Sequence, residues 1–395
     1  MLSGSAAFAA ELEETESAAP GPLSVAIWDA REIPCDWRPG WDRLADEASE
    51  PNVFAERWFV AAGIRHLLPE GPAWMLGVRR GCDPIGLLPV RIERRYGRTP
   101  VAHVENWVHH QSFLGTPLIR RGEEAAFWTE VLKALDAAPW ARGFFHMTGL
   151  VEDGPVHRGL VEAAAALGRP CPVIFRSRRA LLESALSPKA YYEQAVRKKK
   201  RKEIARLSAR LRELGRVAVT RPASAEDSAR CRDEFLALEA AGWKGRAGSA
   251  LASDPAKHAF FRAAIAGAQA AGRLEFLRLA VDDRPIAILV NFLAPPGGFT
   301  FKIAFDENFA RFSPGVLIQI ENLAMLERAE IAWMDSCAVE NHPMIDSLWT
   351  ERRSIVRVTV PLAGRRRRFI HAGARALEMG SAALRRLLAP RNDPT

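Results

Sequence analysis

The amino-acid sequence predicts a mixed α/β protein in which one domain layout occurs twice. Two stretches separated by about 200 residues repeat the same order of elements, a spacing far longer than the period of a solenoid. In the first, the strands AWMLGVRR and PIGLLPVRI flank the turn GCD, and in the second LEFLRLAV and PIAILVNFL flank DDR. Helical segments alternate with these strands, which favours an α/β layer architecture with a mixed sheet.

The order of elements stays the same after each hairpin. A third strand leads to a loop containing Pro117 or Pro314, then to a helix, and then to the strand FFHMT or IAWMD. A chain of 395 residues exceeds the usual size of one domain, so two domains are expected. The predicted segments are a disordered N-terminal tail at 1–21, an N-terminal domain at 22–184, a C-terminal domain at 185–363 and a basic amphipathic tail at 364–395.

Composition limits the classes of protein that the chain can belong to. It has no apolar stretch of the roughly 20 residues that a membrane-spanning helix needs, and its N-terminus lacks the features of a secretory signal. Its five cysteines are widely spaced without a C-x-x-C pair, which argues against a disulfide framework or a zinc site. We therefore expect a cytoplasmic protein without a bound metal.

The net charge of +8 is concentrated in two segments. Residues 196–216 contain ten Lys and Arg against two Glu, and apolar residues at helical spacing predict one amphipathic helix there. Residues 361–395 contain eight Arg against two acidic residues, again with apolar residues at near-helical spacing. Such a tail can lie peripherally on an anionic membrane at the inner face, although a helix packed on its own domain fits the pattern equally well.

The strand FTFKIAFD is the most regular element in the chain. Strict alternation would place four apolar residues on one face, namely Phe299, Phe301, Ile303 and Phe305. The other face would then carry Thr300, Lys302, Ala304 and Asp306. A buried lysine and aspartate cost free energy unless they are paired, solvated or used, so either a Lys302–Asp306 pair or a catalytic role is open.

The segment after this strand predicts the start of a buried helix. Ser313 suits the N-cap position, Pro314 suits the first turn, and Gly315 allows a ligand to approach the backbone closely. The free backbone N–H groups of such a helix start point to one place, where a pyrophosphate can bind.

Three runs of the sequence resemble a known family. FKIAFDENFARFSPGVL, IAWMDSCAVENHPMIDSLW and LEAAGWKGRAGSAL are similar to GNAT-superfamily acyltransferases of the CelD/BcsL-like group, associated with cellulose or exopolysaccharide biosynthesis. The resemblance covers 185–362 well and the first copy loosely, and implies two tandem GNAT-like domains with an acetyl-CoA or other acyl-CoA donor. It implies that the pantetheine lies along the strand ending at Asp306, and that six residues hold the pyrophosphate: Arg311, Phe312, Ser313, Pro314, Gly315 and Val316.

The sequence departs from the wider GNAT pattern in ways that bear on this implication. The phosphate loop has a single glycine, and Pro314 has no N–H to donate. Leu348 and Trp349 stand where many relatives carry a tyrosine that acts as an acid. In the first copy Leu118 replaces the glycine, so that copy is expected not to bind CoA.

An acyl transfer to an ammonium acceptor needs a general base. The carboxylate candidates are Glu239 and Asp306, followed by Asp335, while Glu239 also fits a solvated helix position. The segment GWKGRAGS lacks the order of a nucleotide P-loop, but its Trp243, Lys244 and Arg246 could contact an acidic acceptor or a CoA phosphate, or form a plain surface loop. The loop histidines His103, His109 and His110 more often form hydrogen bonds than metal sites.

Three functions remain open at this point. The first is an acyl-CoA-dependent N- or O-acyltransferase acting on an amine or saccharide, with backbone N–H groups polarising the thioester carbonyl. The second is a Fem-like transferase that uses aminoacyl-tRNA, for which RKKKRK would contact the nucleic acid. The third is a binding protein with a degenerate acyltransferase fold. The presumed phosphate loop favours the first, for which no nucleic acid partner is expected.

Overall fold

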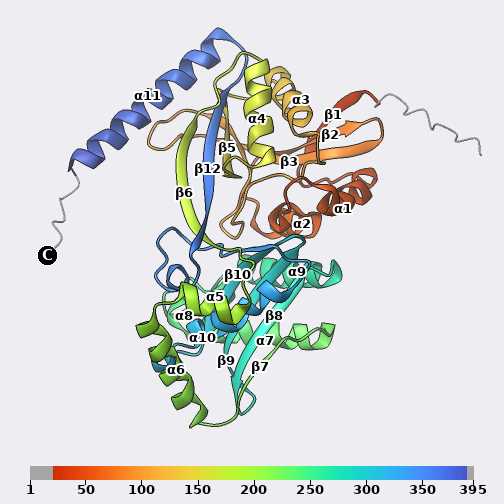
Figure 1. Ribbon diagram of the computed structural model, residues 1–395. Helices are drawn as coiled ribbons and strands as arrows, with labels where there is room; N and C mark the ends of the chain where they lie inside the picture. The colour runs from red at the N-terminus through yellow and green to blue at the C-terminus, as the bar shows by residue number, and fades with distance from the viewer. Residues whose placement is uncertain (1–20, 389–395) are drawn as a thin grey trace, which may run out of the picture.

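The computed structural model describes residues 21–388, with side chains described as far as residue 380. Figure 1 shows two bodies of helices and strands joined by the long strands β6 and β12, with the C-terminal helix α11 extending from one end. We call residues 22–184 the N-terminal half and 185–363 the C-terminal half. These boundaries remain predictions. The tail predicted at 1–21 lies outside the described residues apart from Gly21, as does the end of the second tail, 389–395.

Helices and strands alternate along the whole described chain. The strands are β1 (Leu23–Asp29), β2 (Ala73–Arg80), β3 (Asp83–Glu93), β4 (His103–Asn106), β5 (Phe144–Val151), β6 (Val173–Leu182), β7 (Val217–Thr220), β8 (Leu274–Val281), β9 (Arg284–Ala294), β10 (Gly297–Phe305), β11 (Trp333–Asp335) and β12 (Glu351–Pro361). The α-helices are α1 (Arg38–Glu47), α2 (Arg57–Leu67), α3 (Glu124–Ala137), α4 (Pro155–Ala166), α5 (Pro188–Ala195), α6 (Lys198–Arg212), α7 (Ala225–Ala241), α8 (Trp243–Arg246), α9 (Pro255–Ala270), α10 (Pro314–Glu321) and α11 (Arg365–Leu388). The short 3-10 helices are η1 (Cys35–Trp37), η2 (Val53–Ala55), η3 (Leu251–Ser253), η4 (Glu307–Phe312), η5 (Asn322–Glu327) and η6 (Ile345–Ser347).

The described strands form one 12-stranded mixed sheet that runs through both halves. Its order is β1-β2-β3-β4-β5-β12-β6-β11-β10-β9-β8-β7. Each half places its last strand next to the other half, because β12 pairs with β5 and β6 pairs with β11. The two exchanged strands also pair with each other over most of their length. Backbone hydrogen bonds therefore connect the halves without a break.

The predicted repeat is confirmed in the order of its elements. The hairpins β2/β3 and β8/β9 are antiparallel pairs, and in each half the third strand is followed by a helix and by a parallel strand. The copies differ after that strand. The helix α4 follows β5, whereas the described chain after β11 forms only the 3-10 turn η6 before β12.

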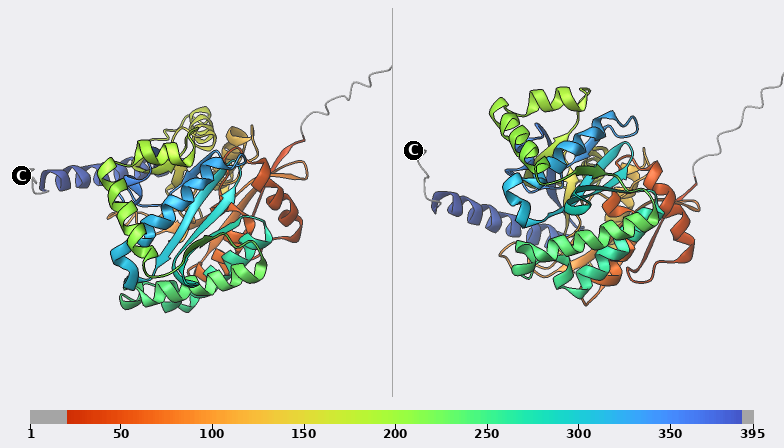
Figure 2. Two further views of the ribbon diagram at one scale, coloured as in Figure 1. Left: turned by 60° about the horizontal axis from the view of Figure 1, so that its bottom comes forward. Right: turned by 90° about the horizontal axis from the view of Figure 1, so that it is seen from below.

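Helices cover both faces of the sheet in the C-terminal half. Figure 2 shows α7 and α9 on one side of the strands, with α6 and α10 on the other. The core under α7 and α9 also takes in aromatic side chains from α2 and η2 of the N-terminal half. The Phe59 and Phe260 rings lie 5.3 Å apart, as do those of Phe54 and Phe299. The two halves thus share one hydrophobic core, which fixes their relative position.

The predicted alternation of β10 is wrong in its second half because the strand contains a β-bulge. The register with β9 shifts between Thr300 and Lys302, which leaves Phe301 as the extra residue. Phe299 and Phe301 pack under α7 and α9, but Ile303 and Phe305 pack on the opposite face. The bulge also brings Lys302 opposite Val290, whose side chain lies in the core under α7 and α9.

The two basic segments form helices, as predicted. In α6 the side chains of Ile204, Leu207 and Leu211 are buried and the charged side chains lie outside. The first part of α11 packs on β5 and β12, where His371 contacts the Thr359 hydroxyl of β12 at 2.9 Å, while Phe369 is 84% exposed. No helix among the described residues is long and apolar enough to cross a membrane.

Candidate active site

The sheet opens where β10 meets β11. These parallel strands pair at only three positions, Gly297 to Phe299 with Trp333 to Asp335. The chain after β11 stays with β6, because the Ser336 N–H donates to the Ala180 carbonyl. The edge of β10 from Thr300 to Phe305 therefore has no strand paired to it among the described residues. Backbone N–H groups on such an edge are available to a ligand.

Helix α10 begins against this edge. A Cβ added to Gly315 would lie 3.6 Å from Ile303 and 3.8 Å from Phe305, both on β10. Ser313 has a left-handed backbone (φ 53°), and its side chain makes no capping bond, so the predicted side-chain cap is wrong. The Val316 N–H donates back to the Ser313 carbonyl at 2.9 Å. With proline at position 314, this geometry leaves the Gly315 N–H as the donor at the very start of the helix.

The remaining residues of the predicted phosphate loop lie in η4. Phe312 is buried in the core under α6 and α10. Arg311 is exposed, and its guanidinium lies 4.8 Å from the centroid of the Phe312 ring. No ion pair of Arg311 is found in the described part of the chain, so its charge is available next to the start of α10.

Lys302 lies near the junction of the two halves. Its Nζ lies 5.1 Å from the centroid of Phe301 and 5.7 Å from that of Phe113, in a loop of the N-terminal half. Burial, together with the like charge of Lys244, lowers the pKa of Lys302 to about 8, and the Glu239 carboxylate opposes this shift. Among the described side chains Lys302 has no ion-pair partner, so the predicted Lys302–Asp306 pair does not form. A lysine in this environment is half neutral near pH 8.

The N-terminal half contributes histidines to the surroundings of Lys302. His109 is buried, stacks on Phe59 with ring centroids 5.4 Å apart, and has no hydrogen-bond partner for its Nε2. Burial, with the charges of His110 and Lys302, lowers the pKa of His109 to about 3. The pKa of His110, which is exposed, is also lowered by partial burial and by nearby lysines, Lys302 among them. These effects place the loop that contains both histidines beside Lys302.

Glu239 is a buried residue of α7 and not a solvated one. Its carboxylate accepts from Lys244 Nζ at 2.7 Å and from the Leu251 N–H at 2.8 Å. The side chain is only 3% exposed. Glu239 therefore holds Lys244, and through it the positive charge that acts on Lys302.

The predicted acceptor segment forms the short helix α8. Its position is fixed by Glu307, which accepts from the Trp243 N–H at 2.5 Å and from Arg246 at 2.6 Å. Trp243 is 57% exposed. Of the three predicted acceptor residues, Trp243 is thus the one that presents an unpaired surface next to the site.

Asp335 and Asp306 are both engaged in structural contacts. Asp335 is fully buried and accepts from Arg179 at 2.7 Å and from Arg353 at 3.2 Å, on the exchanged strands β6 and β12. Although burial raises the pKa of Asp335, the two guanidiniums hold it below its usual range. Asp306 caps η4 and pairs with Arg284 at 2.6 Å. Both carboxylates thus make structural contacts, and a role of either as the general base stays a prediction.

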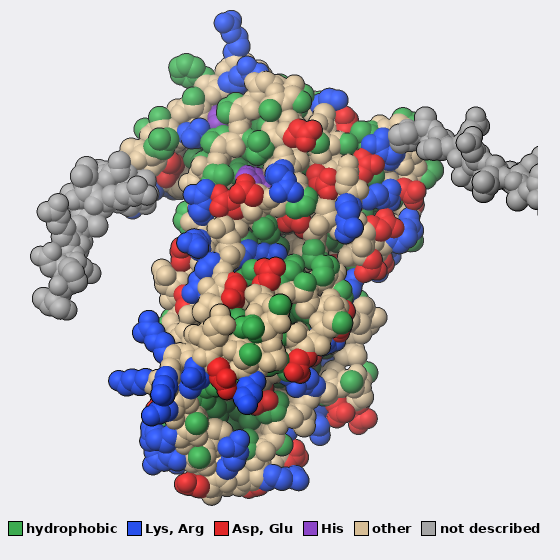
Figure 3. Space-filling model, viewed as in Figure 1, with side chains coloured by type: hydrophobic (Ala, Val, Ile, Leu, Met, Phe, Trp, Pro, Cys, Tyr) green, Lys and Arg blue, Asp and Glu red, His purple; other side chains and the backbone are tan. Residues whose placement is uncertain are grey.

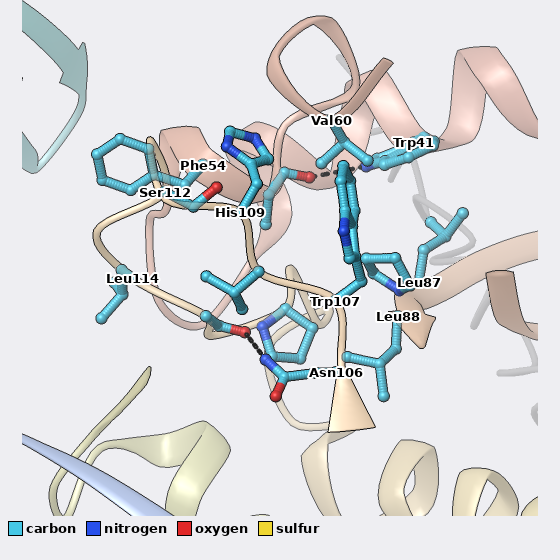
Figure 4. Close-up of a pocket in the computed structure, with 15 residues that line it drawn as sticks. Trp41, Phe54, Val60, Leu87, Leu88, Asn106, Trp107, His109, Ser112 and Leu114 are labelled. Carbon is cyan, nitrogen blue, oxygen red and sulfur yellow. Dashed lines mark hydrogen bonds between the residues drawn. The ribbon is translucent and has the colours of Figure 1, made fainter. Parts of the chain in front are cut away.

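The corresponding junction in the N-terminal half is closed. The Asn106 amide accepts from the Thr148 N–H at 2.8 Å and donates to the Thr148 carbonyl at 3.0 Å, so it links β4 to β5. Figure 4 shows Asn106 and Trp107 in the pocket beside this link. The cavity left there measures about 30 Å³, which is room for one water molecule and no cofactor. That the first copy binds no CoA stays a prediction.

Comparison with known proteins identifies the class to which this arrangement belongs. The sequence profile described as an acetyltransferase (GNAT) domain matches residues 198–342. The C-terminal half thus carries a GNAT acetyltransferase domain. No curated protein matches the chain.

Solved structures share the fold over most of the chain. One is FemX, with 9% identity and a TM-score of 0.55 over 85% of this chain and 96% of that one. Another is a conserved protein of unknown function from Bacteroides thetaiotaomicron, with 12% identity and a TM-score of 0.53 over 86% and 100%. A tandem GNAT protein from the clavulanic acid biosynthesis pathway has 18% identity and a TM-score of 0.43 over 87% and 99%. At these identities the likeness concerns the fold alone.

Sequence reasoning missed the contribution of the N-terminal half to this site. Phe113, His109 and His110 lie in one loop far from Lys302 in sequence, and the fold brings the Phe113 ring centroid to 5.7 Å from Lys302 Nζ. The adjacent histidines and aromatic residues of this loop were visible in the sequence, but nothing in their spacing predicted a contact with the C-terminal half.

Proposed function

We propose that this protein transfers an acyl group from an acyl-CoA thioester to an amine or saccharide acceptor. The observation that carries the proposal is the unpaired edge of β10, which lies against the start of α10 in the segment that matches the GNAT domain. Backbone N–H groups on an open strand edge can hold the pantetheine amides and polarise the thioester carbonyl. The saccharide acceptor and acetyl-CoA as donor rest on the resemblance to CelD/BcsL-like acyltransferases.

The donor's pyrophosphate would bind between Arg311 and the start of α10. The Gly315 N–H and the Arg311 guanidinium supply one dipole and one full charge there. A second source of positive charge lies close by. Helix α6 and helix α10 line one groove of about 650 Å³, with Lys198, Arg201 and Lys202 on the α6 side.

Lys302 is our candidate for the proton transfer. The acceptor's amine or hydroxyl attacks the thioester carbon, a C–N or C–O bond forms, and the C–S bond breaks to release the CoA thiolate. The proton lost by the acceptor passes to the neutral amine of Lys302, which its lowered pKa of about 8 makes available. Glu239 and Lys244 act as positioning residues, because Lys244 raises the fraction of neutral Lys302 and Glu239 holds Lys244 in place.

Titration calorimetry with acetyl-CoA tests donor binding. Arg311→Glu should weaken binding by about tenfold or more, because it replaces a charge-assisted contact with repulsion. Arg65→Glu is the matched control, since Arg65 is also exposed and lies at the end of α2 in the N-terminal half. Absence of heat with the parent protein, or equal affinity for both variants, would contradict the proposed donor site.

A Fem-like transferase that uses aminoacyl-tRNA is the second candidate. It is supported by the small number of N–H donors at the start of α10 and by the basic surface of α6. Figure 3 shows Lys and Arg side chains gathered over α6 at the lower left of the molecule. Gel-shift titration at several salt concentrations distinguishes the two candidates. Salt-dependent binding of charged tRNA, without heat from acetyl-CoA, would favour the Fem-like reaction.

A further inference from the structure

Three side chains that commonly bind metals meet on one face of the N-terminal half. His103 and Glu105 are two residues apart on β4, so they share a face of the strand. His146 lies on the parallel neighbour β5, directly opposite Glu105 in the register. One ligand atom from each residue can be chosen so that all three lie within 4.8 Å of one another.

The distances between these atoms approach those of a coordinated ion. Glu105 Oε2 lies 4.0 Å from His103 Nε2, and Glu105 Oε1 lies 3.5 Å from His146 Nδ1. Tetrahedral ligands about 2.0–2.1 Å from zinc are separated by about 3.3 Å. Small side-chain rotations would therefore bring the three groups to a common centre.

The hydrogen bonds of the cluster leave ligand atoms unused. The His103 Nδ1 lies 3.1 Å from the Val101 carbonyl, which assigns the ring proton to Nδ1 and leaves a lone pair on Nε2. That Nε2 is buried and has no hydrogen-bond partner, and in His146, whose Nδ1 faces Glu105, the other ring nitrogen is also buried without a partner. The side chains of His103 and His146 are only 1% and 10% exposed. Buried polar atoms without partners cost free energy, so a partner supplied by a ligand is expected.

The cluster opens into a pocket of about 680 Å³ that is also lined by α11. Arg357 and Arg375 line the same pocket, and the charge of Arg357 acts on both Glu105 and His146. Two arginines beside a bare divalent cation would repel it. An anionic ligand that bridges the arginines and the metal would remove this repulsion.

We propose that His103, Glu105 and His146 bind one divalent transition-metal ion of the zinc class. Two imidazoles and one carboxylate form the three-ligand set that leaves a coordination position open for another ligand. In this protein the open position faces the pocket, where Arg357 and Arg375 bind the phosphate or carboxylate group of that ligand. The sequence predicted no metal because His146 follows Glu105 by some 40 residues of chain, without a local motif.

Cobalt titration of the full chain, purified without a histidine tag and stripped with a chelator, tests the metal site. Visible absorption of Co²⁺ should saturate at one ion per chain, and Zn²⁺ should displace it. Glu105→Gln keeps the side-chain shape and should weaken Co²⁺ binding at least about tenfold, and His146→Gln should do the same. His66→Gln, at the end of α2, is the control and should bind as the parent does. Equal binding by the parent and by Glu105→Gln overturns the proposal, and circular dichroism confirms that each variant is folded.

Inorganic phosphate serves as the probe for the anionic ligand. If the arginines and the metal bind one anion together, phosphate should tighten Co²⁺ binding in the parent, because the two ligands are thermodynamically linked. The effect should disappear in Arg357→Ala. Co²⁺ binding that phosphate does not change in the parent overturns the anionic part of the proposal.

Discussion

The β4/β5 junction and the β10/β11 junction are equivalent places in the two copies, yet one is closed and the other is open. In the N-terminal half, the side-chain amide of Asn106 lies where the pairing of β4 with β5 ends. It forms hydrogen bonds with both the N–H and the carbonyl of Thr148. In the C-terminal half, Asp335 occupies the position of Thr148, and its carboxylate binds Arg179 and Arg353 instead. The two junctions thus differ in the polar side chain that binds where the strand pairing ends.

The closed copy still takes part in the open one. Its loop with His109 and Phe113 approaches Lys302 on β10, and Arg179 of β6 donates both to Asp335 and to the Phe113 carbonyl at 2.6 Å. The duplicated half has therefore lost its own strand opening and become one wall of the other half's site.

Among the substitutions that test this comparison, Lys302→Met should have the largest effect, which is a loss of turnover. Because it removes the group proposed to take the acceptor's proton, turnover should fall by about 10² to 10⁴ with little change in acetyl-CoA affinity. In the parent, turnover should rise with pH through about 8, because the lowered pKa makes the neutral amine the base above that pH. Steady-state kinetics across pH should show that this rise is missing in the variant.

The control for this substitution is Lys133→Met, which removes an exposed lysine of α3 in the closed half. It should leave both turnover and its pH profile unchanged. Retention of the rise near pH 8 in Lys302→Met would assign the base to another group.

Asp335→Ala should be the most destabilising change at either junction. It leaves the guanidiniums of Arg179 and Arg353 buried without their carboxylate, and breaking a buried ion pair costs about 3–5 kcal/mol. Urea unfolding measures the loss. Asp233→Ala, which removes an exposed carboxylate that also contacts two arginines, should cost about 1 kcal/mol or less. Similar losses for the two variants would mean that the Asp335 network does not stabilise the open junction.

Gly115→Ala should destabilise the closed junction by an intermediate amount. The new Cβ would lie 2.0 Å from the Thr148 carbonyl oxygen and 2.8 Å from Asn106 Nδ2, so the Asn106 link must shift. Overpacking of this kind costs about 1–3 kcal/mol. Thermal or urea unfolding should detect this loss, whereas unchanged stability would show that β4 and β5 can separate without cost.

The sequence predicted the repeat and its order of elements because hairpins and helix starts have local signatures. It could not predict the β-bulge at Phe301, since alternation of apolar residues continues through the bulge and the packing of both faces decides the register. The sequence also could not predict the exchange of β6 and β12, because pairing between strands that lie far apart in the chain leaves no local pattern.

The candidate site was also only partly predictable, because the sequence shows single residues but not their partners from distant segments. Lys302 stood out as a polar residue in an apolar strand, and Glu239 was a carboxylate candidate that also fitted a solvated helix position. In the structure Glu239 is buried, and its charge acts on Lys302. Asp306, and after it Asp335, also looked suitable as a base, but their arginine partners come from other strands. The fold is needed to distinguish the two aspartates, which form ion pairs with arginines, from Lys302, which has no ion-pair partner among the described side chains.

Gly315→Ala, at the start of α10, should have the smallest effect on stability. It tests a binding role for Gly315, in contrast to the packing role of Gly115. Unlike the change at Gly115, it adds a Cβ that meets only ordinary contacts, the nearest being Met344 Sδ at 3.4 Å. Alanine favours the helix by about 0.5–1 kcal/mol, so stability should stay the same or rise slightly. Affinity for acetyl-CoA should nevertheless fall by a few fold if the pyrophosphate approaches the backbone here, as calorimetry can measure.

Gly373→Ala, in an exposed turn of α11 with open space around the new Cβ, is the control that changes helix propensity alone. Unchanged affinity in Gly315→Ala, together with unchanged affinity in Arg311→Glu, would move the phosphate site away from the start of α10.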